Sequence, residues 1–209
     1  MVVVAHKVVS KAEGRTRSLA EVEPGPEAQR IAAAQGKDPR LLQVVLDESA
    51  RVVRESPRVL ICETSHGFVC ANAGVDRSNT GDPEEVVLLP EDPDASARTL
   101  RAALPGRPAV LIADSFSRPW RLGQTDVALG AAGLLTLDDW RGRADAAGRT
   151  LEATEIAVAD AVAAAADLAR AKDSAEPVVL VRGLERFVTQ DDGPGAKALQ
   201  RPRDEDLFL

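Results

Sequence analysis

The chain has 209 residues, of which 44% are hydrophobic and 28% charged, and its formal net charge is −7. These values fit one large domain with a buried core, and the acidic balance argues against a nucleic-acid binder, whose surface is normally basic. No apolar run reaches the ~20 residues that span a bilayer, and the opening MVVVA is too short for a signal peptide. We therefore expect a soluble cytoplasmic protein that binds neither nucleic acid nor membrane, although metal ions and a few placed cations would still let it bind a nucleotide.

The N-terminal part of the chain is predicted to contain one strand, two helices and a hairpin. Apolar residues recur at helical spacing after residue 38, and two short apolar runs flank a Ser-His-Gly turn. In chain order the predicted elements are a buried strand over 2–9, a polar turn over 10–15, helices over 28–35 and 38–53, and a hairpin over 58–72.

The C-terminal part alternates strands and helices irregularly. The predicted elements are a strand over 86–89, a helix over 95–104 capped by Asp94, a strand over 108–113, an apolar glycine-rich stretch over 125–133, a helix over 154–172 and a strand over 177–181. Residues 190–209 are rich in glycine, proline and charge, and we expect a mobile tail there. The pattern predicts a mixed α/β or α+β fold, a single domain over 1–209 with a mixed sheet, a central hairpin and flanking helices.

The two cysteines, Cys62 and Cys70, are compatible with a disulfide, part of a metal site or plain core residues. Both lie in strand-like sequence and the chain carries no export signal. Two buried free thiols are therefore the favoured interpretation.

Two aspartates are candidates for a metal site. Asp76 and Asp114 each follow a strand-like segment, where side chains can converge on fixed backbones, and Ser115 adds a neighbouring hydroxyl. Carboxylate and hydroxyl oxygens suit Mg²⁺ or Mn²⁺. Spacing alone leaves equally open that each aspartate caps a turn.

Lys11 is a candidate for contact with a phosphate. It falls in the polar turn after the first predicted strand, where it is either a point charge for a nucleotide or a solvated lysine. The chain has no GxxxxGK[ST] loop and no GxSxG elbow, and its only histidines are His6 and His66, which excludes a His-rich zinc site.

Several segments, in the same order along the chain, resemble the coenzyme F420-0:L-glutamate ligase family. They are HKVVSKAEGR at 6–15, CETSHGFVCANAGVDRSN at 62–79, LPEDPD at 89–94, DSF at 114–116, RPWR at 118–121, GQTDVA at 123–128 and LVRG at 180–183.

The resemblance implies a GTP-dependent ligase of coenzyme F420 biosynthesis. Such an enzyme joins L-glutamate by an amide bond to F420-0 or a dehydro precursor through an acyl phosphate, and then extends a γ-linked tail. It also implies two divalent ions, Mg²⁺ or Mn²⁺, and a homodimer.

Site residues follow from the resemblance by position. Asp76 and Asp114 would be the catalytic metal ligands, with Ser115 on the second ion. Lys11 and Asn79 would contact GTP, and the segment 168–176 would wrap the nucleotide through Ala171 and Lys172.

The chain departs from the family pattern in several places. Ser115 stands where threonine is usual, Ser65 where a second histidine is frequent, His6 where a serine contacts GTP, and Ala171 where glycine is common. The family's usual N-terminal segment and the nitroreductase-like domain of some relatives have no counterpart, so we expect an N-terminally short, single-domain version.

Two other functions remain open at this point. The first is that of a catalytically impaired relative that serves as a nucleotide-binding or scaffolding subunit. The second is that of an amide ligase with a different acceptor. Arg118 and Arg121 are candidates for receiving an anionic precursor, although both are equally compatible with a structural role.

Overall fold

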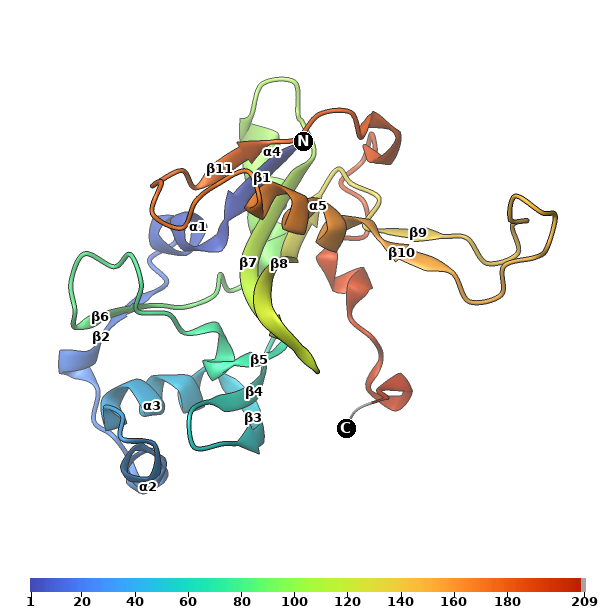
Figure 1. The fold of residues 1–209 in the computed structure, drawn as a ribbon. Helices are drawn as coiled ribbons and strands as arrows, with labels where there is room; N and C mark the ends of the chain where they lie inside the picture. The colour runs from blue at the N-terminus through green and yellow to red at the C-terminus, as the bar shows by residue number, and fades with distance from the viewer. Residues whose placement is uncertain (208–209) are drawn as a thin grey trace. The chain divides into compact units, whose positions relative to one another are not determined.

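The computed structural model describes residues 1–207 and confirms the mixed α/β class (Figure 1). The residues group into two compact units. The first unit comprises 1–5, 92–115 and the chain from 125 onward, and the second comprises 6–91 and 116–124. A single ligase-like domain over 1–209 stays a prediction.

The first unit is built on a four-stranded mixed sheet in the order β11-β1-β7-β8 (Figure 1). Strand β1 runs parallel to β7 and antiparallel to β11, with Val3 opposite both Leu111 and Val179. The elements of this unit are β1 (Val2–Ala5), α4 (Pro93–Ala103), β7 (Val110–Arg118), β8 (Arg121–Ala132), β9 (Leu137–Asp139), β10 (Glu155–Ala157), α5 (Val158–Asp167), β11 (Val178–Leu180) and the short 3-10 turns Glu185–Phe187, Ala196–Leu199 and Arg203–Glu205. The end of β7 and the start of β8, within residues 116–124, belong to the second unit.

Helix α5 forms the core of the first unit together with the sheet. Ala159, Ala163 and Ala166 lie on one helical face and are almost fully buried, alongside Val158 and Val162 of the same helix. Small side chains allow a helix to pack close to the strands, which explains why this core is filled with so few aromatic residues.

The second unit combines two small antiparallel sheets with short helices. Its hydrophobic core brings Ile31, Leu42 and Leu60 together with Cys62 and Ala73. The elements are α1 (His6–Ala12), β2 (Thr16–Ser18), the 3-10 turn Leu19–Glu21, α2 (Pro26–Gln35), α3 (Pro39–Asp47), β3 (Ser49–Glu55), β4 (Leu60–Thr64), β5 (Val69–Ala71), the 3-10 turn Asn72–Gly74 and β6 (Glu85–Val87).

The predicted hairpin over 58–72 is confirmed, because β4 and β5 pair antiparallel around the Ser-His-Gly turn. The cysteines are confirmed as buried free thiols. Cys62 and Cys70 lie opposite each other in the β4–β5 register, and burial raises the pKa of Cys62 above its ordinary value.

The predicted strand over 2–9 is too long. The strand ends at Ala5, and His6–Ala12 forms helix α1, in which His6, Val9 and Ser10 are buried. These positions have the i, i+3, i+4 spacing of one helical face, a pattern that a short apolar run does not distinguish from a strand. Lys11 therefore lies in the last turn of a helix, not in a polar turn.

Two predicted helices are also too long. Helix α3 ends at Asp47, and Ser49–Glu55 pairs with β4 as strand β3. Helix α5 spans Val158–Asp167, while Glu155–Ala157 pairs with β9. In both cases pairing with a neighbouring strand decides the conformation of residues whose own propensity is ambiguous.

Asp94 does not cap helix α4 as predicted. The cap is Asp92, whose side chain accepts a hydrogen bond from the Ala95 N–H. Asp94 lies in the first turn and accepts hydrogen bonds from the N–H groups of Ala131 and Ala196, at 2.8 and 2.7 Å.

Within the tail, Ala196 is buried. The expected mobility of 190–209 stays a prediction, and residues 208–209 lie outside the described part of the chain. Along residues 1–207, none of the helices has the length and apolar character that crossing a bilayer requires.

Candidate functional site

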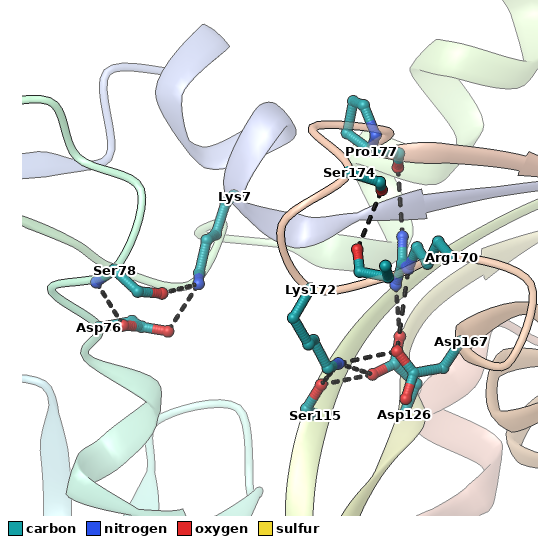
Figure 2. Close-up of polar contacts among 11 residues, drawn as sticks. Lys7, Asp76, Ser78, Ser115, Asp126, Asp167, Arg170, Lys172, Ser174 and Pro177 are labelled. Atoms are coloured by element: carbon teal, nitrogen blue, oxygen red, sulfur yellow. Dashed lines mark hydrogen bonds and ion pairs between the residues drawn. The ribbon is translucent and has the colours of Figure 1, made fainter.

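A group of polar side chains meets in the first unit, and we call it the Ser115 cluster: Ser115, Asp126, Asp167, Arg170 and Lys172 (Figure 2). Ser115 lies on β7 and Asp126 on the adjacent strand β8, while Asp167 is the last residue of α5. Arg170 and Lys172 lie on the segment that connects α5 to β11. Two of the residues expected at the site, Ser115 and Lys172, are thus brought together.

Asp126 is at the centre of the Ser115 cluster. Its Oδ1 accepts a hydrogen bond from the Ser115 hydroxyl at 2.6 Å, and its Oδ2 accepts one from Arg170 at 2.5 Å. The carboxylate is 1% exposed and the Arg170 side chain 10% exposed. Removing one partner of such a buried ion pair typically lowers stability by about 3–5 kcal/mol. The pair therefore holds Arg170, at the start of the connecting segment, against strand β8.

Lys172 closes the Ser115 cluster on its exposed side. Its ammonium donates to the Ser115 Oγ at 2.8 Å and to Asp167 Oδ1 at 2.7 Å. The lysine side chain is 67% exposed, so the cluster presents an exposed cation close to a buried carboxylate. A cation in this position is suited to meet a phosphate.

The connecting segment itself is tightly turned. The Ser174 N–H and hydroxyl both donate to the carbonyl of Ala171, at 3.2 and 2.9 Å. Arg170 also donates to the Pro177 carbonyl at 3.4 Å. Ala171 therefore contributes its backbone carbonyl to a turn in the very segment that was expected to wrap the nucleotide.

In the second unit, Lys7 and Ser78 hold Asp76 (Figure 2). The Lys7 ammonium lies 2.7 Å from Asp76 Oδ2, and the Ser78 N–H donates to Oδ1 at 2.6 Å. Burial raises the pKa of Asp76, but Lys7 and Ser78 together outweigh it, so that this pKa lies below its ordinary value. Asp76 is therefore an ionised carboxylate at neutral pH, although the bond from Ser78 also makes it a turn-capping residue.

Lys11 and Asn79 are brought together as well. The Lys11 ammonium of helix α1 donates to the backbone carbonyl of Asn79, which has a positive φ of 59°. Asparagine is one of the few residues other than glycine that tolerates this conformation. The two residues expected to contact GTP are thus in direct contact within the second unit.

Asp114 lies within β7, directly before Ser115, and is half-buried. The strand does not end at Ala113 as predicted but continues to Arg118. Asp76 and Asp114 belong to different units. Within residues 1–207, no three His, Cys, Asp or Glu side chains are grouped as a metal site.

Two positions that depart from the family pattern, His6 and Ser65, differ in burial. His6 is buried, with Nδ1 3.3 Å from the Ser10 hydroxyl oxygen. His66 donates from Nε2 to the carbonyls of Pro90 and Glu91, at 2.9 and 3.1 Å, and stacks on Phe68. Ser65, beside it, is exposed.

Lys7, Asp126, Asp167 and Arg170 were not singled out from the sequence. Asp126 could have been found, because residues 126, 128, 130 and 132 alternate along a strand and all four are buried. A charged residue on an apolar strand face requires a partner, and the pattern would have indicated one. Lys7 gives no comparable signal, since the helix that carries it was predicted as a strand.

The chain is similar to known proteins of one family. The sequence model of the family described as F420-0:Gamma-glutamyl ligase matches residues 1–183. The chain is 46% identical to the coenzyme F420:L-glutamate ligase of Methanothermobacter thermautotrophicus, over all of this chain and 84% of that protein. The proteins of the same name from Methanopyrus kandleri and Methanocaldococcus jannaschii are 45% and 39% identical, over 98% and 100% of this chain and 83% and 84% of those proteins. The chain therefore belongs to the F420-0:gamma-glutamyl ligase family and is a ligase.

Proposed function

We propose that this protein is a GTP-dependent ligase that joins L-glutamate by an amide bond to F420-0 or its dehydro precursor in coenzyme F420 biosynthesis. The observation that carries the proposal is identity of 39–46%, over essentially the whole chain, to relatives named coenzyme F420:L-glutamate ligase. The exposed Lys172 ammonium, beside Ser115, supports a phosphate-bearing substrate, because a cationic donor forms charge-assisted hydrogen bonds to anionic oxygen.

The chemistry begins with activation of the acceptor. A carboxylate of the precursor attacks the γ-phosphorus of GTP, the bond to the β-phosphate oxygen breaks, and GDP leaves. The amine of glutamate then attacks the acyl phosphate, so that an amide forms while phosphate and a proton are released. In later cycles the γ-carboxylate of the added glutamate takes the place of the first acceptor.

The proposed ligands fit divalent ions. Asp76, Asp114 and Ser115 offer carboxylate and hydroxyl oxygens, which is the donor chemistry of Mg²⁺ and Mn²⁺ sites. When bound, two such ions would neutralise charge on the phosphates. The depressed pKa of Asp76 keeps its carboxylate ionised, as a metal ligand must be.

The remaining residues act by binding and orientation. Lys11, Asn79, Ala171 and Lys172 would contact GTP, the two lysines as point charges and the other two through backbone or amide groups. Arg118 is a candidate for binding the anionic precursor. This assignment is weaker than those for GTP, because the Arg118 guanidinium also donates to the Leu122 carbonyl at 3.5 Å.

We also propose a homodimer, on the basis of the family resemblance alone. Light scattering of the purified chain would test it, with a mass of about 44 kDa expected for twice the 22.1 kDa chain.

The first test is Asp114→Asn, which removes the charge and keeps the shape. Ligation of glutamate with GTP and Mn²⁺ should be abolished, while the melting temperature and circular dichroism stay close to those of the wild type. Asp139→Asn, at an exposed carboxylate on β9, is the matched control and should ligate normally. Ligation by Asp114→Asn with an unchanged dependence on Mn²⁺ would remove Asp114 from the metal site.

A further inference from the structure

The Ser115 cluster contains a buried carboxylate that the proposed chemistry does not use. Asp126 is 1% exposed and therefore unsuited to touch a substrate or an ion directly. It nevertheless contacts both a proposed metal ligand, Ser115, and the segment proposed to wrap the nucleotide, through Arg170.

The contact with Ser115 fixes the direction of the hydroxyl. A hydroxyl has one proton to donate and lone pairs to accept. The proton of Ser115 is directed to Asp126 Oδ1 at 2.6 Å, so the lone pairs face away from this carboxylate. Lys172 already uses that accepting side, at 2.8 Å from Oγ. A cation approaching Ser115 would meet the same lone pairs without any need to turn the hydroxyl.

The contact with Arg170 fixes the connecting segment. The guanidinium joins Asp126 at 2.5 Å and the Pro177 carbonyl at 3.4 Å, and thereby ties both ends of the turn over 170–177. Because the Arg170 side chain is 10% exposed, loss of Asp126 would leave a buried cation without its main partner. The segment would then have to move to rehydrate it.

We propose that Asp126 is a positioning residue that aligns the Ser115 hydroxyl for a divalent ion and holds the 168–176 segment in place for the nucleotide. It acts through Ser115 and Arg170, and not by touching the reacting groups. This inference rests on the proposed function, because it assigns Asp126 to the same metal and nucleotide site. Groups that orient a metal ligand typically change metal affinity by about 10- to 100-fold when they are lost.

The test compares Mn²⁺ affinity, measured by electron paramagnetic resonance in the presence of a non-hydrolysable GTP analogue. Asp126→Asn and Ser115→Ala should each weaken Mn²⁺ binding by about tenfold or more. The double variant should lose less affinity than the two single losses combined, because part of the effect of Asp126 passes through the hydroxyl that is already absent. Ser115→Thr, which keeps the hydroxyl, should bind like the wild type.

Two further variants separate positioning from stability. Asp160→Asn changes another partly buried carboxylate of the first unit, which accepts a hydrogen bond from the Ala128 N–H, and should leave Mn²⁺ affinity unchanged. If Asp126→Asn alone fails to fold, the variant that combines it with Arg170→Gln removes both charges together and avoids an unpaired cation. It should fold and still lose about tenfold in Mn²⁺ affinity.

The outcomes distinguish the two levels of the proposal. Wild-type protein that binds neither Mn²⁺ nor the GTP analogue would overturn the proposed function, and this inference with it. Wild-type binding that Asp126→Asn retains in full, with only a lower melting temperature, would overturn the positioning role alone. If Asp126→Asn lowers Mn²⁺ affinity by the same factor with and without the Ser115 hydroxyl, the proposed alignment of that hydroxyl by Asp126 is overturned.

Discussion

Lys7 and Asp76 show how one ion pair sets the charge state of a proposed ligand. Burial by itself raises the pKa of a carboxyl group, and the net lowering at Asp76 depends on the Lys7 ammonium and the Ser78 N–H. The Asp76 side chain is 38% exposed, so solvent screens the pair and its contribution to stability is modest.

Lys7→Gln should lower the free energy of unfolding by about 0.5–1 kcal/mol at pH 7, with no metal added. A carboxyl whose pKa is lowered by folding stabilises the fold above its ordinary pKa of about 3.9, and this stabilisation is lost as the pH falls through the lowered value. The difference between variant and wild type should therefore shrink in acid to the part contributed by the bond from Lys7 to the Ser78 hydroxyl, which does not titrate. Urea unfolding at pH 7 and near pH 2.5 measures it.

Lys37→Gln is the control for this prediction, because Lys37 donates to the Arg58 carbonyl and that bond has no titrating acceptor. Its effect should be the same at both pH values. A Lys7→Gln effect that is equally large in acid would show that the lysine stabilises the fold by packing, and would contradict the electrostatic account of Asp76.

At the scale of the element, strand β8 has a close contact with helix α4 that requires glycine. A Cβ on Gly130 would lie 2.1 Å from the Pro93 carbonyl oxygen, a backbone atom at the start of α4. Pro93 is buried, and Asp94 beside it accepts the Ala131 N–H of the same strand. The strand and the helix start are thus held together at this glycine and at the residue that follows it.

Gly130→Ala should destabilise the protein by about 2–3 kcal/mol, because backbone must move to admit the methyl group. Gly25→Ala is the matched control, since its Cβ would meet only the flexible end of Gln43 at 3.3 Å. It should change stability by less than about 1 kcal/mol. Thermal unfolding of both variants gives the comparison, and equal melting temperatures would contradict the close packing of β8 on α4.

The sequence predicted the elements whose own pattern is decisive. The β4–β5 hairpin and strand β11 appear where the apolar runs and turn residues place them. The strand over 2–9 and the helix over 38–53 were wrong at one end and the helix over 154–172 at both, because strand pairing and helical burial depend on partners distant in the sequence.

At the scale of the whole molecule, the candidate site residues within each unit come from stretches far apart in the sequence, and this limits what a pattern can predict. Ser115 and Lys11 were named from the local pattern and from the family resemblance, Lys172 and Asn79 from the resemblance alone, and each lies beside another named residue. The strand pattern could have indicated that Asp126 needs a partner, but its contact with Arg170 appears only when β8 and the 168–176 segment meet. The metal-binding role of Asp76 and Asp114 stays a prediction.

The central claim is that glutamate ligation is coupled to consumption of GTP. The most direct measurement incubates the protein with F420-0, L-glutamate, GTP and Mn²⁺, and follows the product by mass spectrometry together with phosphate release. The account predicts a product heavier by one glutamate residue, with one phosphate and one GDP released for each amide formed. Amide formation without GTP consumption, or GTP hydrolysis with no glutamate incorporated, would contradict it.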